Sequence, residues 1–234
     1  MKKQLPNLIT LLNLLSGSIA AYHASNGRLE TAGYFILLGI LFDFLDGFAA
    51  RLLKTQSPLG KELDSLADMV TSGLAPGIIM FQLLRHAVFS WDVSGWNIIP
   101  YAGFLLTLGA AYRLAAFNIS PDDRSYFKGL PTPAMSLLTL SLPFVRHYGP
   151  GWLMPATYSL VFLLLIIVFS VVFMNLPIRM FTLKFENYSP SRNRLKYLFI
   201  ILSGIILFFF RFGAFLLIIP LYVLLSLFAL PKKS

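Results

Sequence analysis

The sequence contains no cysteine. Disulfide-stapled folds and metal sites with thiolate ligands are therefore excluded. Charged residues are also scarce, at 12% of the chain, whereas a soluble domain usually carries about 25%. Because 57% of the residues are hydrophobic, the excess apolar surface has to face lipid. The composition thus predicts an integral membrane protein.

Long apolar runs divide the chain into candidate membrane spans. A spanning helix needs about 20 mostly apolar residues. This measure predicts eight segments, near residues 8–24, 31–52, 65–88, 97–117, 132–147, 152–175, 195–210 and 213–230. The last two are so close together that they could form a tight hairpin or one broken segment, and totals of six or seven spans stay open. The expected fold is an all-α polytopic helix bundle, formed by a single domain over residues 1–234.

The basic residues indicate an orientation in the membrane. A net charge of +9 would suggest nucleic acid as the partner of a soluble protein, but here it indicates contact with anionic lipid head groups. With eight spans and a cytoplasmic N-terminus, the cytoplasmic side receives every Lys and Arg except Arg28, Arg85, Arg146 and Arg211. Cytoplasmic loops of membrane proteins are enriched in these residues. We therefore expect both termini in the cytoplasm, and no nucleic-acid partner.

Four carboxylates interrupt this apolar sequence. Asp43 and Asp46 are three residues apart, so they share one face of a helix, and Asp64 and Asp68 share a face of the next helix at a spacing of four. The short connection predicts that the two helices are antiparallel neighbours. Their acidic faces can then meet, near the cytoplasmic end of both helices.

Four carboxylates in one pocket would repel one another strongly unless cations are bound. Two divalent cations would cancel their charge, and hard cations such as Mg²⁺ or Mn²⁺ prefer oxygen ligands. Two-metal carboxylate sites commonly serve phosphoryl transfer. Two alternatives remain: solvated carboxylates paired with Arg51, Lys54 and Lys61, or the cation or proton pathway of a transporter.

The spacing of these carboxylates and their neighbours resembles the signature of the CDP-alcohol phosphotransferase family, Asp-x2-Asp-Gly-x2-Ala-Arg-x8-Gly-x3-Asp-x3-Asp. All of its fixed positions are matched, by Asp43, Asp46, Gly47, Ala50, Arg51, Gly60, Asp64 and Asp68. The resemblance implies transfer of a phosphate-linked group from a CDP-linked donor to an alcohol. It also implies a six-helix catalytic core over about residues 5–175 and two extra helices over about 195–230.

The resemblance assigns roles to these positions. The first three Asp residues supply most of the metal ligands, and Asp68 is the general base. The residues expected to hold the cytidine diphosphate are Asn7, Thr10, Gly47, Ala50, Arg51, Gly60 and Ser65.

Further tracts resemble the phosphatidylserine synthase branch of that family. They are Asp64-Ser-Leu-Ala-Asp68, Arg113-Leu-Ala-Ala-Phe-Asn118 and Phe127-Lys-Gly-Leu-Pro131. One departure is Ala116, where many relatives have Arg. The branch implies CDP-diacylglycerol and L-serine as substrates, a homodimer among membrane lipids, and the cytoplasmic membrane of a prokaryote as location. The acceptor could also be glycerol 3-phosphate or inositol phosphate.

The candidates for binding the acceptor or a lipid head group are Arg113, Asn118, Lys128, Gly129 and Pro131. Free serine needs a cation for its carboxylate, and Arg113 or Lys128 could supply it. Each candidate also has a simpler role: Arg113 could snorkel to the membrane surface, Lys128 could be a loop charge, and residues 129–131 could form a turn that begins a helix.

Overall fold

The computed structural model describes residues 4–89, 98–119, 127–181 and 193–229. Within these ranges the chain is almost entirely helical, and its two strands, β1 (Phe127–Lys128) and β2 (Arg179–Met180), are two-residue segments paired antiparallel. The predicted all-α class is confirmed. The α-helices are α1 (Leu5–Ser25), α2 (Leu29–Leu52), α3 (Pro58–Asp68), α4 (Ala75–Phe89), α5 (Leu105–Asn118), α6 (Thr132–Tyr148), α7 (Leu160–Asn175), α8 (Arg194–Phe210) and α9 (Phe215–Ala229).

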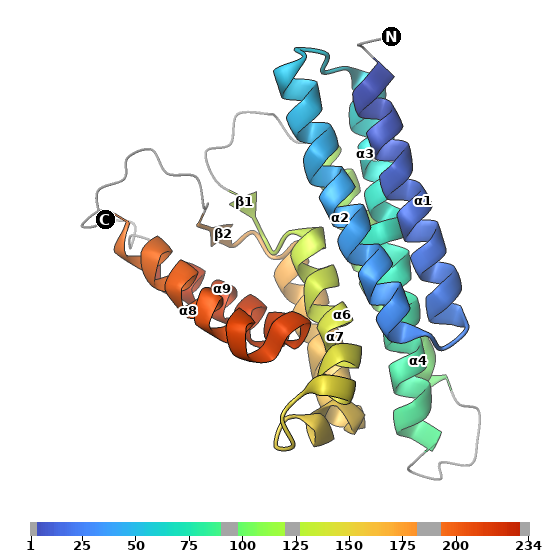
Figure 1. Cartoon of the computed structure of the whole chain (residues 1–234), viewed down its shortest axis with the longest axis vertical. Coiled ribbons are helices and arrows are strands. Elements are labelled where there is room, and N and C mark those ends of the chain that lie inside the picture. Colours follow the sequence, from blue (N-terminus) through green and yellow to red (C-terminus); the bar gives the residue numbers. More distant parts are fainter. Residues whose placement is uncertain (1–3, 90–97, 120–126, 182–192, 230–234) are drawn as a thin grey trace.

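The helices α1 and α2 run side by side along the long axis of the molecule, and α3 and α4 follow one another along α1 (Figure 1). The turn between α1 and α2 contains Gly27, whose φ of 75° is a left-handed conformation that favours glycine. At the start of α3, the Ser57 side chain accepts a hydrogen bond from the Gly60 N–H and Pro58 occupies the first turn, as is common at helix N-termini. The two acidic helices α2 and α3 run in opposite directions, as predicted, and both pack on α1 (Figure 1).

A π-helix, η2 (Met69–Leu74), joins α3 to α4 without a break. It ends just before Pro76, which lacks the N–H of a regular helix position and whose ring would crowd the carbonyl one turn earlier. The wider turn begins directly after Asp68. Such π-helical insertions often lie at functional sites.

The helix α6 forms the centre of the molecule. Eleven of its residues are buried, and it contacts α2, α4 and α9 as well as η2. Before α5 and α7, 3-10 helices cover Ile99–Phe104 and Met154–Tyr158. The largest core cluster joins α1, α2, α4, α6 and α7.

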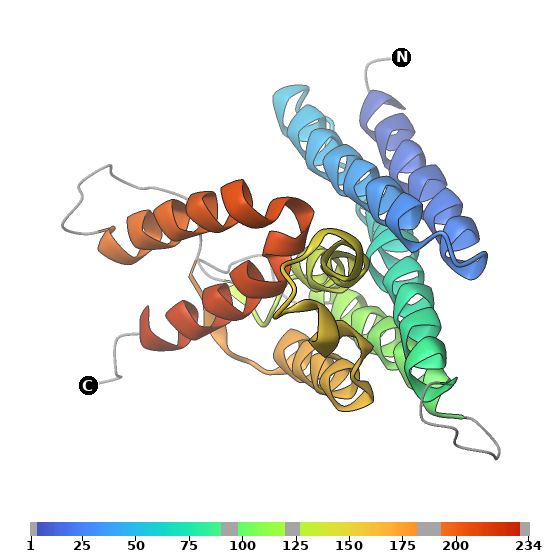
Figure 2. The same ribbon diagram turned by 60° about the horizontal axis from the view of Figure 1, so that its bottom comes forward.

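The last two helices form a hairpin on the side of α6 away from α1 (Figure 2). A 3-10 turn, Arg211–Ala214, connects them. The rings of Phe199 on α8 and Tyr222 on α9 have centroids 5.6 Å apart, whereas one straight helix would separate these residues by about 34 Å. Of the two arrangements left open by the sequence, the hairpin is therefore the one that forms.

Each of the eight predicted segments is largely helical over its described residues, with Ile98, the turn at residues 152–153 and Ser159 as exceptions. Within the described ranges, three helical stretches are long and apolar enough to cross a membrane, namely Leu5–Ser25, Pro58–Phe89 and the folded-back Arg194–Leu227. Large apolar side chains such as Leu8, Leu15 and Phe208 are exposed on α1 and α8, as expected of helices in lipid. A total of eight spans stays a prediction. The terminal residues 1–3 and 230–234, predicted to be cytoplasmic, lie outside the described ranges.

Candidate functional site

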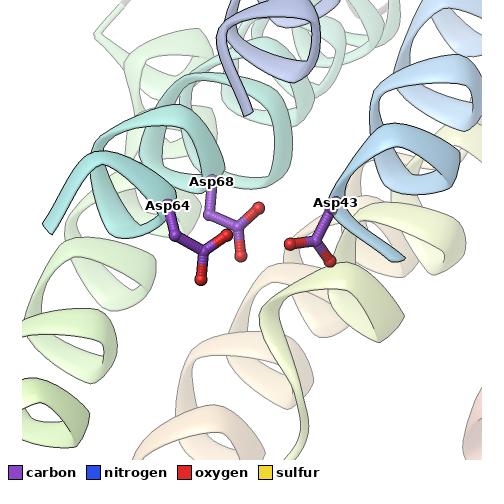
Figure 3. Close-up of side chains that lie close together, drawn as sticks. All are labelled: Asp43, Asp64 and Asp68. Carbon is purple, nitrogen blue, oxygen red and sulfur yellow. The ribbon is translucent and has the colours of Figure 1, made fainter. Parts of the chain in front are cut away.

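Three of the four aspartates come together between α2 and α3. Asp43 projects from α2, and Asp64 and Asp68 project toward it from α3 (Figure 3). One carboxylate oxygen from each lies within 4.8 Å of the other two. Asp68 is buried, while Asp43 and Asp64 are half-buried. Carboxylate oxygens this close to one another suit a hard divalent cation.

Asp46 is not part of this group of three, but it is close enough to Asp43, Asp64 and Asp68 to interact with each of them electrostatically. Its side chain is buried next to Thr10 of α1, and its Oδ2 atom has no hydrogen-bond partner among the described residues. The Asp64 Oδ1 atom is likewise buried without a described partner. Unpaired buried oxygens are costly, so both atoms fit positions that a bound ligand or cation completes.

The ion-pairing alternative for these carboxylates is not seen. Among the described residues, which include Arg51, Lys54 and Lys61, no salt bridge reaches any of the four aspartates. Arg51 lies beside Gly47 instead: a β-carbon at position 47 would be 3.5 Å from the Arg51 Nη1 atom.

Residues expected to hold the cytidine diphosphate gather along the neighbouring parts of α1, α2 and α3. A β-carbon at Gly60 would lie 3.2 Å from the Asn7 Oδ1 atom, so the starts of α3 and α1 are adjacent. Thr10, one turn beyond, is buried and donates to the Pro6 carbonyl at 3.0 Å. Ala50 is half-buried on α2. Within the predicted set, Asn7 is thus close to Gly60, and Thr10 is close to Asp46.

The side chains of Ser65 and Asn118 hydrogen-bond to each other. The Asn118 Nδ2 atom donates to the Ser65 Oγ atom at 3.0 Å, and the Ser65 hydroxyl lies 3.2 Å from the Asn118 Oδ1 atom. Glu62 and Lys61 also bond to Asn118, at 3.4 and 3.1 Å. These contacts attach the end of α5 to the helix that carries Asp64 and Asp68.

Arg113 is the predicted acceptor-binding residue that reaches the carboxylates. It is close enough to Asp68 for an electrostatic interaction, and its Nη1 atom is 3.5 Å from the Thr132 hydroxyl. Its Nε atom is buried without a hydrogen-bond partner among the described residues. A cation in this position can bind an anionic group of a substrate beside Asp68.

The tract Lys128–Pro131 instead docks on the end of α7. The Gly129 N–H donates to the Ile178 carbonyl at 2.8 Å and the Leu130 N–H to the Phe173 carbonyl at 2.7 Å. Gly129 has a φ of 70°, and Pro131 precedes the first residue of α6. Lys128 is exposed. The contacts described for this tract are structural, and it is Thr132, just beyond it, that meets Arg113.

Asn13 on α1 is a site residue that the sequence reasoning did not select. Its Nδ2 atom donates to the Asp68 Oδ1 atom at 3.2 Å, and its backbone carbonyl accepts from the Thr71 hydroxyl at 3.1 Å. Asn13 is completely buried. The available signal was its spacing from Asn7 and Thr10, since all three fall on one face of a helix.

Comparisons with known proteins agree on one family for this chain. The family model for CDP-alcohol phosphatidyltransferase matches residues 3–172, a range that ends before α8. A CDP-diacylglycerol–serine O-phosphatidyltransferase of Bacillus subtilis is 32% identical over 164 residues, which cover 68% of this chain and 85% of that protein. These matches confirm the family resemblance of the motif.

Other relatives with the same name extend well beyond the region that aligns with this chain. The Saccharomyces cerevisiae protein is 37% identical over 157 residues, 60% of this chain and 54% of its own length. The Mycobacterium bovis protein is 31% identical over 156 residues, 63% of this chain and 52% of its own length. The matched region therefore spans about half of these two relatives.

Proposed function

Since the chain belongs to the CDP-alcohol phosphatidyltransferase family, we propose that it transfers a phosphatidyl group from CDP-diacylglycerol to the hydroxyl of L-serine. The products are phosphatidylserine and CMP. The observation that carries this proposal is the convergence of Asp43, Asp64 and Asp68 within 4.8 Å. The choice of serine is supported by the names of the relatives and by Arg113 beside Asp68.

The donor set fits two divalent cations, Mg²⁺ or Mn²⁺. Asp43, Asp64 and Asp68 offer oxygen ligands, and the unpartnered Oδ2 atom of Asp46 makes this residue the fourth ligand. When bound, the cations neutralise the diphosphate and stabilise CMP as the leaving group.

The residues of the chain divide the remaining work. Asp68 takes the proton of the serine hydroxyl as the serine oxygen bonds to the phosphorus that carries diacylglycerol, and the bond from this phosphorus to the CMP oxygen breaks. Asn7, Thr10, Gly47, Ala50, Arg51, Gly60 and Ser65 hold the cytidine diphosphate. Ser65 acts partly through its bonds with Asn118.

Arg113 binds the carboxylate of serine. Its long bond to Thr132 at 3.5 Å leaves donors available, and its place next to Asp68 would bring the serine hydroxyl to the base. Asn118, Lys128, Gly129 and Pro131 then act more remotely. Asn118 supports α3, and the tract from Lys128 supports the start of α6.

The site suits a membrane boundary, because one substrate is a lipid and the other is soluble in water. We place it at the cytoplasmic face, with both termini in the cytoplasm, in the cytoplasmic membrane of a prokaryote. By family resemblance we also expect a homodimer, which chemical cross-linking of the protein in membranes would test.

The deciding experiment measures CMP release by the purified protein from CDP-diacylglycerol with Mg²⁺ or Mn²⁺. Serine, glycerol 3-phosphate, inositol and inositol phosphate are supplied in separate reactions. We expect release that depends on serine and is lost in Asp68→Asn. Release with another alcohol alone would overturn serine as the acceptor, and full activity of Asp68→Asn would overturn the role of the base.

A further inference from the structure

We propose that Asn13 is a positioning residue, which holds the Asp68 carboxylate in the orientation that meets Asp43 and Asp64. The inference rests on the proposed function for the reaction it concerns. The contact itself is a structural observation: the Asn13 Nδ2 atom donates a hydrogen bond of 3.2 Å to the Asp68 Oδ1 atom.

Asp68 depends on this bond because it has few other partners. An ionised carboxylate has two oxygens and accepts about four hydrogen bonds. The amide of Asn13 donates the one side-chain hydrogen bond to Asp68 found among the described residues. One amide donor orients the carboxylate and leaves the rest of its acceptor positions for a cation or a proton.

Asn13 is itself closely packed. Its backbone carbonyl accepts from Thr71, which lies in the π-helix three residues after Asp68. A β-carbon at Gly39 of α2 would lie 2.9 Å from the Asn13 Oδ1 atom and 2.5 Å from the Thr71 Cγ2 atom. The amide is therefore enclosed by α2 and η2, and its Nδ2 atom is directed at Asp68.

The chemistry of such supporting bonds predicts the size of the effect. Partners that orient a metal-binding group contribute about 10- to 100-fold to metal affinity or activity. A group that serves only to hold helices together would lower stability without this loss. The two roles can therefore be separated by measuring turnover, metal affinity and stability in the same variants.

Two substitutions remove the donor, Asn13→Leu with a similar volume and Asn13→Ala with a smaller one. Gln82→Leu is the matched control. Gln82 is also a buried amide, and its Nε2 atom bonds at 2.8 Å to the Ser25 carbonyl at the other end of α1. It thus joins α1 to α4, whereas the Asn13 bond joins α1 to α3, about 18 Å further along α1.

The full-length protein in detergent is assayed for CMP release with serine, for Mn²⁺ binding by electron paramagnetic resonance, and for thermal unfolding. Both Asn13 variants should lower kcat by about 10- to 100-fold, leave the KM for CDP-diacylglycerol within about 3-fold, and weaken Mn²⁺ binding by about 10-fold or more. Gln82→Leu should lower the unfolding temperature comparably and keep kcat and Mn²⁺ affinity.

Wild-type kcat and Mn²⁺ affinity in both Asn13 variants would overturn the inference. Failure of both variants to fold would also overturn it, because Asn13 would then serve stability. If the wild type binds Mn²⁺ but transfers to no alcohol, the proposed function fails, and the Mn²⁺ affinities of the variants still decide the role of Asn13.

Discussion

Replacement of Gly17 by alanine should force α1 away from the π-helix. A β-carbon at this position would lie 2.8 Å from both the N and Cα atoms of Thr71, whereas ordinary contacts begin near 3.4 Å. Backbone atoms cannot rotate away, so the helices must separate by about 0.6 Å or more. Overpacking of this kind costs about 1–3 kcal/mol of unfolding free energy.

The same displacement should reach Asp68. Asn13 lies one turn before Gly17 on the same face of α1, and its bond to Asp68 is already 3.2 Å long. Lengthening it by the same amount gives about 3.8 Å, which is too long for a hydrogen bond. Gly17→Ala should therefore lower CMP release as well as stability.

Gly204→Ala is the matched control, because the β-carbon at this position of α8 would meet nothing within 4 Å. Both substitutions gain about 1 kcal/mol of helix propensity, so their difference isolates the overpacking. Thermal or denaturant unfolding in detergent measures it. Gly17→Ala should be less stable than Gly204→Ala by about 1–3 kcal/mol. Equal stability of the two variants would refute the close approach of α1 to Thr71.

Three further predictions concern other contacts. Gly129→Ala should destabilise more than Gly27→Ala, by about 1–3 kcal/mol in unfolding, because both have positive φ but only Gly129 faces the carbonyls at the end of α7. In a double-mutant cycle, Ser65→Ala and Asn118→Ala should show a coupling of about 0.5–3 kcal/mol, and additive effects would contradict their mutual bonds. EDTA should abolish CMP release, and Mg²⁺ or Mn²⁺ should restore it; activity in EDTA would argue against a metal site. Asp43→Asn should lower the restored rate by more than about 100-fold, because loss of a metal ligand should cost more than loss of a residue that only orients a ligand.

The helices were predictable because their signals are local. Runs of about 20 apolar residues mark segments that are largely helical in the structure, although α3 begins at Pro58, before the predicted apolar run from residue 65. Such runs predict the positions of the helices better than they predict the number of membrane crossings. α2 is 24 residues long and carries Asp43 and Asp46, and it is not one of the three apolar stretches.

The site was predictable only in part. The spacing of Asp64 and Asp68 put both on one face, and the short connection to α2 predicted that Asp43 would meet them, as it does. Asp46 is close enough to all three to interact with them electrostatically, but its side chain also meets Thr10 on α1. Helical periodicity specifies the face on which a residue lies, and a third helix decided which neighbour it meets.

The chemistry of this protein is thus contained in local sequence: the eight motif residues identify the family, and their spacing aligns the carboxylates along two helices. Tertiary packing decided which groups support them. Asn13 is 55 residues from Asp68 and Asn118 is 53 residues from Ser65, so neither contact follows from periodicity within one helix. These pairs form because close approach at Gly17 and Gly39, and the docking of α5 on α3, bring the helices together.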